Sequence, residues 1–162
     1  IIKSRGINAK FVLAGKVDPF NKYSLKKKDL IEIQKKKIVE VLGHQTDIPN
    51  LFWKSHIICL PSYYGEGLPK VLIEAAAAQR AVITTNHPGC RDAIIPNKTG
   101  ILVPIKNPTK LANAIQYLIE NYKVRISMGL AGRDLAEREF NIEKIVNKHA
   151  KIYTELNQNL NL

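Results

Sequence analysis

The chain alternates short apolar runs with stretches of helical periodicity. Five runs have the pattern of strands: Lys10 to Gly15, Ile38 to Gly43, Ile57 to Leu60, Ala81 to Thr85 and Gly100 to Val103. Helical stretches cover about Ser24 to Lys37, Ile48 to Lys54, Pro69 to Arg80, Arg91 to Ile95, Pro108 to Asn121, Val124 to Glu139 and Ile142 to Leu156. Runs that are apolar on both faces and separated by helices favour a parallel sheet with helices on both sides. We therefore predict an α/β fold of three layers, a Rossmann-like, doubly wound parallel sheet.

Residues at the helix starts fit these boundaries. Asp47 is placed to cap the second helix, Asn107 or Thr109 the fifth, and Asn141 the last. The opening residues, Ile1 to Gly6, have the pattern of a helix end with its glycine stop. A sheet of this kind is expected to have one more strand and helix before it. We therefore expect residues 1–162 to be one domain excised from a longer protein.

Composition agrees with one domain that has its own core, because 45% of the 162 residues are hydrophobic. No apolar run approaches the length of about 18 residues that a membrane-spanning helix needs. Two cysteines, Cys59 in a predicted buried strand and Cys90 in a loop, do not make a disulfide framework. They fit a reducing cytoplasm, and we expect Cys59 to be an inert core residue.

The net charge of +11 creates a positive field that attracts nucleic acid, anionic lipid or a diphosphate, and it does not choose among them. Much of the charge lies in two lysine runs, 26–28 and 35–37, which flank Leu30, Ile31 and Ile33 in an amphipathic pattern. One interpretation is a solvated helix face. The alternative is a face that helps to hold the protein at a membrane surface.

The most informative segment is a predicted strand, a Gly/Pro loop and a helix in direct succession, ending at Glu74. The loop supplies a carboxylate at Glu66 and free backbone N–H groups at Gly67 and Leu68. These N–H groups and the positive end of the helix dipole suit a pyrophosphate. Each carboxylate can accept hydrogen bonds from a pair of sugar hydroxyls. The segment thus predicts a binding site for a nucleotide sugar, with Glu66 near the hexose and Glu74 near the ribose.

Further motifs follow in order. The Glu-x7-Glu run leads into Glu74-Ala-Ala-Ala-Ala, then Ala81 to Thr85, then Pro88-Gly-Cys-Arg-Asp92, and then Asn97 to Pro104. A lone Glu-x7-Glu is a weak signal, but the ordered series is strong. From Pro61 to Pro104 the chain resembles the C-terminal, donor-binding half of family 4 glycosyltransferases, which are retaining enzymes of the two-Rossmann-domain GT-B architecture. The likeness continues more faintly over most of the chain.

The resemblance implies a set of site residues. Glu66 is the catalytic candidate, and the donor-binding candidates are Gly67, Leu68, Lys70, Glu74, Gly43 and His44. Pro69 is expected at the first helical position. Each residue also has a simpler interpretation: Lys70 and Glu74 can form an exposed i,i+4 pair, and His44 can be incidental rather than a neighbour of the base. Neither a cofactor nor a metal is expected, since no Cys/His/Asp spacing suggests a metal site and no Asp-x-Asp is present.

The resemblance also implies a reaction and partners. The intact enzyme is expected to transfer a hexose or N-acetylhexosamine from a nucleotide diphosphate sugar, UDP favoured, to an undecaprenyl-linked glycan in polysaccharide or lipopolysaccharide biosynthesis. The expected location is the cytoplasm, with attachment to the inner face of the plasma membrane as an option. In the family, an Arg and a Lys upstream clamp the pyrophosphate and an N-terminal Rossmann half precedes them. We therefore expect this chain alone to bind donor weakly and to transfer nothing.

Two alternatives belong to other classes. A basic nucleic-acid-binding module would explain the charge, but the aromatic residues do not interleave with the lysine runs and no RNP, KH or zinc-finger pattern is present. A nicotinamide-dependent Rossmann oxidoreductase fragment would need a Gly-x-Gly-x-x-Gly loop after its first strand. That alternative leaves the Glu-x7-Glu run unexplained.

Overall fold

A computed structural model describes residues 1–20, 24–65 and 67–160. For residues 159 and 160 it describes the backbone and not the side chains. The chain divides into two compact units, residues 1–50 and residues 51–162, with α2 (Ile48–Trp53) across the boundary. Each unit is described by itself.

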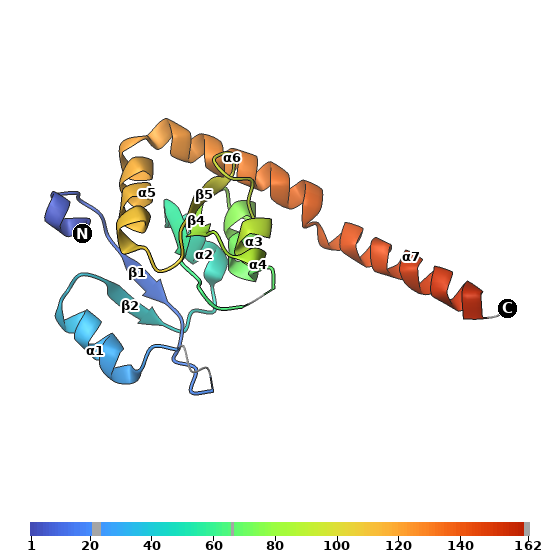
Figure 1. Cartoon of the computed structure of the whole chain (residues 1–162), viewed down its shortest axis with the longest axis horizontal. Coiled ribbons are helices and arrows are strands. Elements are labelled where there is room, and N and C mark those ends of the chain that lie inside the picture. The colour runs from blue at the N-terminus through green and yellow to red at the C-terminus, as the bar shows by residue number, and fades with distance from the viewer. Residues whose placement is uncertain (21–23, 66, 161–162) are drawn as a thin grey trace. The chain divides into compact units, whose positions relative to one another are not determined.

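The first unit is built around two parallel strands, β1 (Val12–Ala14) and β2 (Glu40–Gly43), with Val12 opposite Glu40. A short 3-10 helix, η1 (Lys3–Arg5), precedes them and ends at Gly6, whose φ of 72° is left-handed. This confirms the predicted glycine stop. Helix α1 (Lys27–Lys35) packs beside β2 (Figure 1).

Burial in the first unit is shallow. Ile2 is its one fully buried hydrophobic residue among those that the structure describes, and Val12 in β1 is 41% exposed. The expectation that these two strands are buried on both faces is therefore wrong. Two short strands and one nine-residue helix offer too little surface to cover both sides of the pair.

The second unit contains the main core. Its strands are β3 (Ile57–Leu60), β4 (Ala81–Thr85) and β5 (Gly100–Val103), and they pair in parallel in that order. Its helices are α3 (Lys70–Ala77), α4 (Pro88–Asp92), α5 (Pro108–Glu120), α6 (Tyr122–Glu139) and α7 (Ile142–Leu160).

Strand β4 lies at the centre of this sheet, and all five of its residues are buried. Since neighbouring strand residues point to opposite faces, both faces of the sheet are covered. Helices α3, α5 and α6 supply contacts to β4, and in Figure 1 α5 and α3 lie on different sides of the strands. The predicted α/β, Rossmann-like fold with parallel strands is thus confirmed.

The pairing of the strands differs from the prediction. Hydrogen bonds join the described strands as two parallel sheets, β1-β2 and β3-β4-β5, rather than as one sheet of five. Apolar periodicity reports which residues form strands, but it carries no information on which strands become neighbours.

Helix boundaries follow the caps. Asp47 Oδ1 accepts from the Asn50 N–H at 3.2 Å, Asn107 Oδ1 from Lys110 at 2.9 Å, and Asn141 Oδ1 from Glu143 at 2.8 Å. The three predicted caps are confirmed. The short helix begins earlier than expected, at Pro88 rather than Arg91, because proline suits the first helical position.

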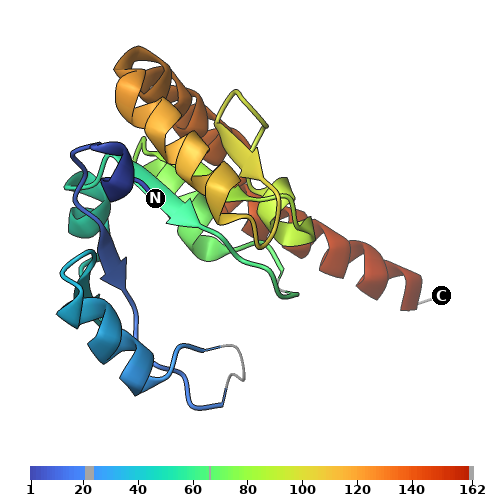
Figure 2. The same cartoon turned by 60° about the vertical axis from the view of Figure 1, so that its left-hand side comes forward.

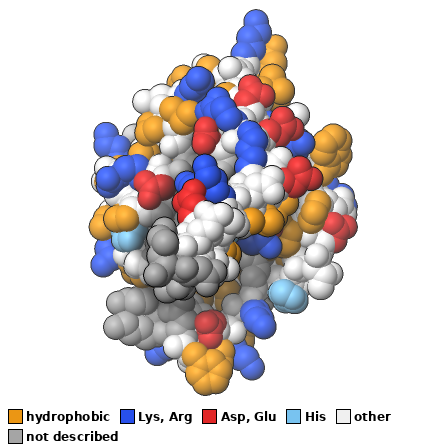
Figure 3. All heavy atoms as spheres, turned by 90° about the vertical axis from the view of Figure 1, so that its right-hand side faces the viewer, with side chains coloured by type: hydrophobic (Ala, Val, Ile, Leu, Met, Phe, Trp, Pro, Cys, Tyr) orange, Lys and Arg blue, Asp and Glu red, His pale blue; other side chains and the backbone are white. Residues whose placement is uncertain are grey.

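Helix α7 runs away from the β3-β4-β5 sheet in both Figure 1 and Figure 2. Along it, large apolar side chains are exposed: Ile142, Ile145, Val146, Ile152, Tyr153 and Leu156. None of the helices in the described residues is long and apolar enough to cross a membrane. On the face in Figure 3, basic and acidic side chains are interspersed with hydrophobic ones, so the net positive charge is not gathered there in one patch.

Candidate functional site

The loop between β3 and α3 begins at the carboxyl end of β3, and two threonines of β4 fix its start. Thr84 Oγ1 donates to the carbonyl oxygen of Leu60 at 2.8 Å, and Thr85 Oγ1 donates to the carbonyl oxygen of Ser62. Both threonines are almost completely buried. Buried side-chain bonds of this kind hold the backbone firmly, because breaking one leaves a carbonyl unpaired.

The other end of the loop is the N-terminus of α3. Pro69 is the N-cap, with φ −69° and ψ 118°, and its carbonyl oxygen accepts from the Leu72 N–H at 3.0 Å. The expectation that Pro69 is the first helical residue is wrong by one position, because its ψ is extended and the helix begins at Lys70. No side chain of the described chain caps this helix end. Its first N–H groups are therefore suited to an external anion.

The loop just before α3 is open. Gly67 and Leu68 are both exposed, and a Cβ added at Gly67 would meet nothing within 4 Å. A ligand can thus approach the backbone closely there. Glu66, the catalytic candidate, lies outside the described residues.

Glu74 lies in the second turn of α3, and its side chain is 39% exposed. Its Oε1 is 3.3 Å from the Nζ of Lys70, whose side chain is 87% exposed. The simple i,i+4 pairing is therefore present. An exposed pair of this kind contributes only about 0.3–0.5 kcal/mol, so it can give way to a ligand that offers Glu74 better hydrogen bonds.

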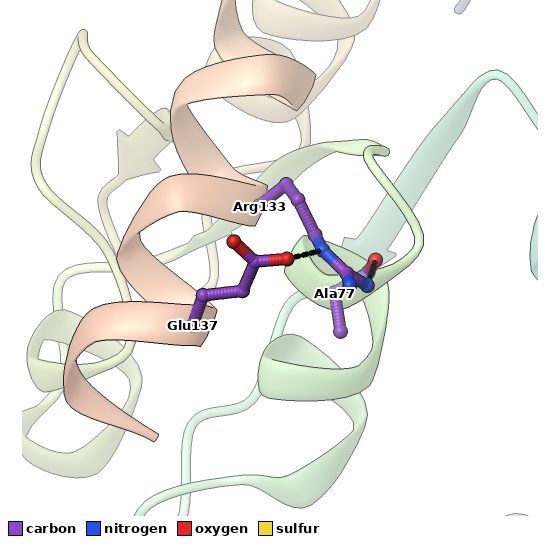
Figure 4. Close-up of polar contacts among 3 residues, drawn as sticks. All are labelled: Ala77, Arg133 and Glu137. Carbon is purple, nitrogen blue, oxygen red and sulfur yellow. Dashed lines mark hydrogen bonds and ion pairs between the residues drawn. The ribbon is translucent and has the colours of Figure 1, made fainter. Parts of the chain in front are cut away.

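The C-terminal end of α3 is fixed by α6 (Figure 4). Arg133 Nη1 donates to the carbonyl oxygen of Ala77 at 2.7 Å, and its Nε contacts Glu137 Oε1 at 2.5 Å. Nearby, Gly129 of α6 approaches the end of α3 so closely that a Cβ there would lie 2.2 Å from the carbonyl oxygen of Gln79. Helix α3 is thus held by α6 at its C-terminal end, away from its open N-terminus.

Residues after the three strands add polar groups that the sequence analysis did not assign. Lys106, after β5, places its Nζ 5.1 Å from the ring centre of Tyr63 in the β3–α3 loop. Ser62 Oγ and His87 Nδ1 are buried without a hydrogen-bond partner in the described part of the chain. The feature that Lys106, Ser62 and His87 share is their position after a strand of the sheet. Ligands of open α/β sheets bind beyond the carboxyl ends of the strands.

A further side-chain bond lies at the end of β4. Arg91 Nε donates to Asn86 Oδ1 at 2.8 Å. This bond ties α4 to the residue that follows β4.

The last two predicted site residues belong to the first unit. Gly43 ends β2 with φ +68°, a conformation that favours glycine, and its carbonyl oxygen accepts from the Gly15 N–H at 2.8 Å. His44 follows it and is exposed. Their roles at the nucleotide base stay predictions.

Two hollows can be described from the lining residues. One, of about 550 Å³, is in the first unit, and the other, of about 290 Å³, lies where α3, α6 and α7 meet. Neither is lined by Glu74, Gly67 or Leu68. The candidate site is the N-terminus of α3, where free N–H groups are exposed. An open helix N-terminus needs no enclosed cavity to attract an anion. Among the described residues, no group of three or more His, Cys, Asp or Glu is arranged to hold a metal ion.

A family model described as glycosyl transferases group 1 matches residues 1–135. The chain belongs to this family. This group 1 glycosyl transferase chain is 28% identical over 153 residues to the capsular polysaccharide biosynthesis glycosyltransferase CapM of Staphylococcus aureus, covering 94% of the chain and 40% of CapM. It is 32% identical over 123 residues to the N,N'-diacetylbacillosaminyl-diphospho-undecaprenol alpha-1,3-N-acetylgalactosaminyltransferase of Campylobacter jejuni, covering 75% of the chain and 32% of that protein.

The fold of the group 1 chain is that of solved GT-B structures. Anabaena HepE in complex with UDP matches 95% of the chain and 51% of HepE, with a TM-score of 0.78 and 17% identity. At this identity the likeness shows the fold alone. The chain spans 40% or less of the length of the two relatives above.

Proposed function

We propose that the N-terminus of α3 binds the pyrophosphate of a nucleotide sugar, UDP-sugar favoured, and that the whole protein is a retaining glycosyltransferase. The observation that carries the proposal is the uncapped start of α3 beside the exposed Gly67 and Leu68. N–H groups and the helix dipole stabilise negative charge at this position. When the bond from the sugar to the diphosphate breaks, the same groups stabilise the leaving group.

The two carboxylates take different roles in this proposal. Glu74 accepts hydrogen bonds from the ribose hydroxyls, and Glu66 lies at the hexose, where charge develops on the sugar. Contacts that strengthen in the transition state act mainly on kcat. Glu66→Ala should therefore reduce turnover of the intact enzyme more than UDP affinity, whereas Glu74→Ala should reduce both.

The proposed sugar is a hexose or N-acetylhexosamine, and the proposed acceptor is an undecaprenyl-linked glycan in polysaccharide or lipopolysaccharide biosynthesis. Support comes from the C. jejuni relative, whose name gives an N-acetylgalactosaminyl group and a diphospho-undecaprenol acceptor. The name of the S. aureus relative refers to capsular polysaccharide biosynthesis. A lipid-linked acceptor would bring a cytoplasmic enzyme to a membrane surface.

The test is the order of ligand affinities, measured by calorimetry or ligand-observed NMR on the chain. UDP should bind about fivefold more tightly than UMP, because helix-terminal contacts to a phosphate contribute on the order of 1 kcal/mol. NAD should not compete. Equal affinity for UMP and UDP would remove the pyrophosphate role, and a clear preference for GDP would overturn the assignment of the base.

A further inference from the structure

The outward side of α1 combines lysines with an exposed apolar residue. At roughly 100° per residue, Lys27, Lys28, Ile31 and Lys35 fall within about 100° of one side of the helix. All four are exposed, and Ile31 retains 52% of its accessible surface. The half-buried Leu30 and Ile33 lie on the other side of α1 and account for its packing. Ile31 therefore lies on the opposite side of α1 from Leu30 and Ile33.

The acidic residues of α1 do not neutralise these lysines. Asp29 Oδ2 accepts from the backbone N–H of Lys26 at 3.0 Å, and Glu32 pairs with Lys36 at 2.6 Å. Within the described residues, no ion pair involves Lys27, Lys28 or Lys35. Leu25, just before the helix, is a second exposed apolar residue at 46%.

A groove of about 550 Å³ continues the basic surface at the C-terminal end of α1. Gln34 and Lys37 line it together with Lys3 and Lys10. Lys3 Nζ donates to the Lys37 carbonyl oxygen at 3.2 Å, and Lys10 pairs with Glu40 at 2.6 Å. The rest of the lining includes apolar residues that precede β1, Ala9 and Phe11, and Val41 of β2.

We propose that the outward side of α1, centred on Ile31 with Lys27, Lys28 and Lys35, docks on an anionic lipid bilayer. Lysines attract anionic headgroups, and an apolar side chain among them enters the headgroup boundary. Nucleic acid fits this surface less well. Ile31 gains nothing beside phosphates, and all the positively charged residues from position 16 to position 37 are lysines, without the arginines that bind phosphate in bidentate fashion.

Flotation of the whole chain with vesicles tests the proposal. Vesicles of phosphatidylcholine with phosphatidylglycerol should bind the chain, vesicles of phosphatidylcholine alone should not, and added salt should weaken binding. K27Q/K28Q/K35Q should reduce partitioning about 100-fold, since each lysine near an anionic surface contributes about fivefold. The matched control is K144Q/K148Q/K151Q, which removes the same charge from the exposed helix α7 and should have little effect.

A second pair of variants separates insertion from attraction. Ile31→Ser should reduce partitioning about tenfold, whereas Ile126→Ser, at a residue of α6 with 54% exposure, should not. Thermal melting checks that each variant is folded. Equal binding to neutral vesicles, equal losses in the control variants, or tighter binding to an oligonucleotide than to anionic vesicles would each overturn the proposal. UDP affinity should be unchanged in all four variants, so this test does not depend on the proposed donor site.

Discussion

Glu74 has two interpretations that a substitution can separate. If it binds ribose, Glu74→Gln replaces a charge-assisted acceptor with an amide that faces two hydroxyls. The expected loss of donor affinity is about tenfold to 100-fold, from about 1.5–3 kcal/mol. If its only role is the exposed pair with Lys70, the change costs about 0.5 kcal/mol of stability and leaves the donor KM as it was. Donor kinetics of the intact enzyme give the measurement.

Two control variants sharpen this comparison. Lys70→Gln removes the same ion pair but leaves the Glu74 carboxylate in place, so the proposed hydrogen bonds from ribose to Glu74 should remain. Glu137→Gln disrupts another i,i+4 pair, on α6, and should leave donor binding unchanged. A donor KM that is unchanged in Glu74→Gln would assign Glu74 to the pair alone.

Cys59 was expected in the core, but its side chain is exposed. The protein atoms around the sulfur nevertheless desolvate it and raise its pKa from 9.0 to about 12. The exposure of the Cys59 side chain favours its reaction with a reagent, whereas the desolvation of its sulfur opposes that reaction. Because the thiolate is the nucleophile, the raised pKa of Cys59 makes it slow to react despite its exposure.

In a Cys90→Ala background, Cys59 should therefore react with iodoacetamide near pH 8.5 at least tenfold more slowly than free cysteine. Unfolding in urea should restore the rate. Since the thiol ionises in the unfolded chain before it does so in the folded one, its contribution to stability is complete below pH 9 and is lost as the pH rises towards 12. A folded-state rate equal to that of free cysteine would contradict the raised pKa.

The packing of helix α6 on helix α3 depends on two glycines of α6, Gly129 and Gly132. Alanine normally stabilises a helix relative to glycine by about 1 kcal/mol. At Gly132 a Cβ would lie 3.5 Å from the Ala76 Cα, an ordinary contact. At Gly129 it would lie 2.2 Å from the Gln79 carbonyl oxygen, so the two helices would have to separate.

Gly132→Ala should thus be neutral or stabilising, whereas Gly129→Ala should destabilise the chain by about 1–3 kcal/mol. Urea denaturation of the two variants measures the difference. Similar unfolding free energies for both would mean that α6 does not hold α3 as closely as the structure shows. Because α3 carries the candidate site, Gly129→Ala should also weaken UDP binding.

Several elements could be predicted from the sequence because their signals are local. Asp47, Asn107 and Asn141 cap the predicted helices, and β3, β4 and β5 have the predicted bounds. The close approach at Gly129 could not be predicted, since a glycine inside a helical pattern does not reveal its neighbour. The same holds for the bonds of Thr84 and Thr85, which depend on the pairing of β3 with β4.

At the scale of the whole molecule, the ordered motif series identified the family, whereas burial and strand pairing needed the structure. The first unit has apolar strand patterns but little core, because burial depends on the elements that cover a strand and not on its own residues. For the candidate site, sequence indicated Gly67, Leu68, Lys70 and Glu74 on one strand–loop–helix segment. It did not indicate Ser62, His87 or Lys106, which follow strands of the same sheet.

We propose that a nucleoside diphosphate binds at the N-terminus of α3. The most direct test is a titration of the isotope-labelled chain with UDP, followed through its backbone amide signals by NMR. We expect the largest shifts on Gly67, Leu68, Lys70 and Val71, and smaller shifts at the same amides with UMP. Shifts confined to the groove at Lys3, Lys10 and Lys37, with the signals of the α3 N-terminus unmoved, would contradict it.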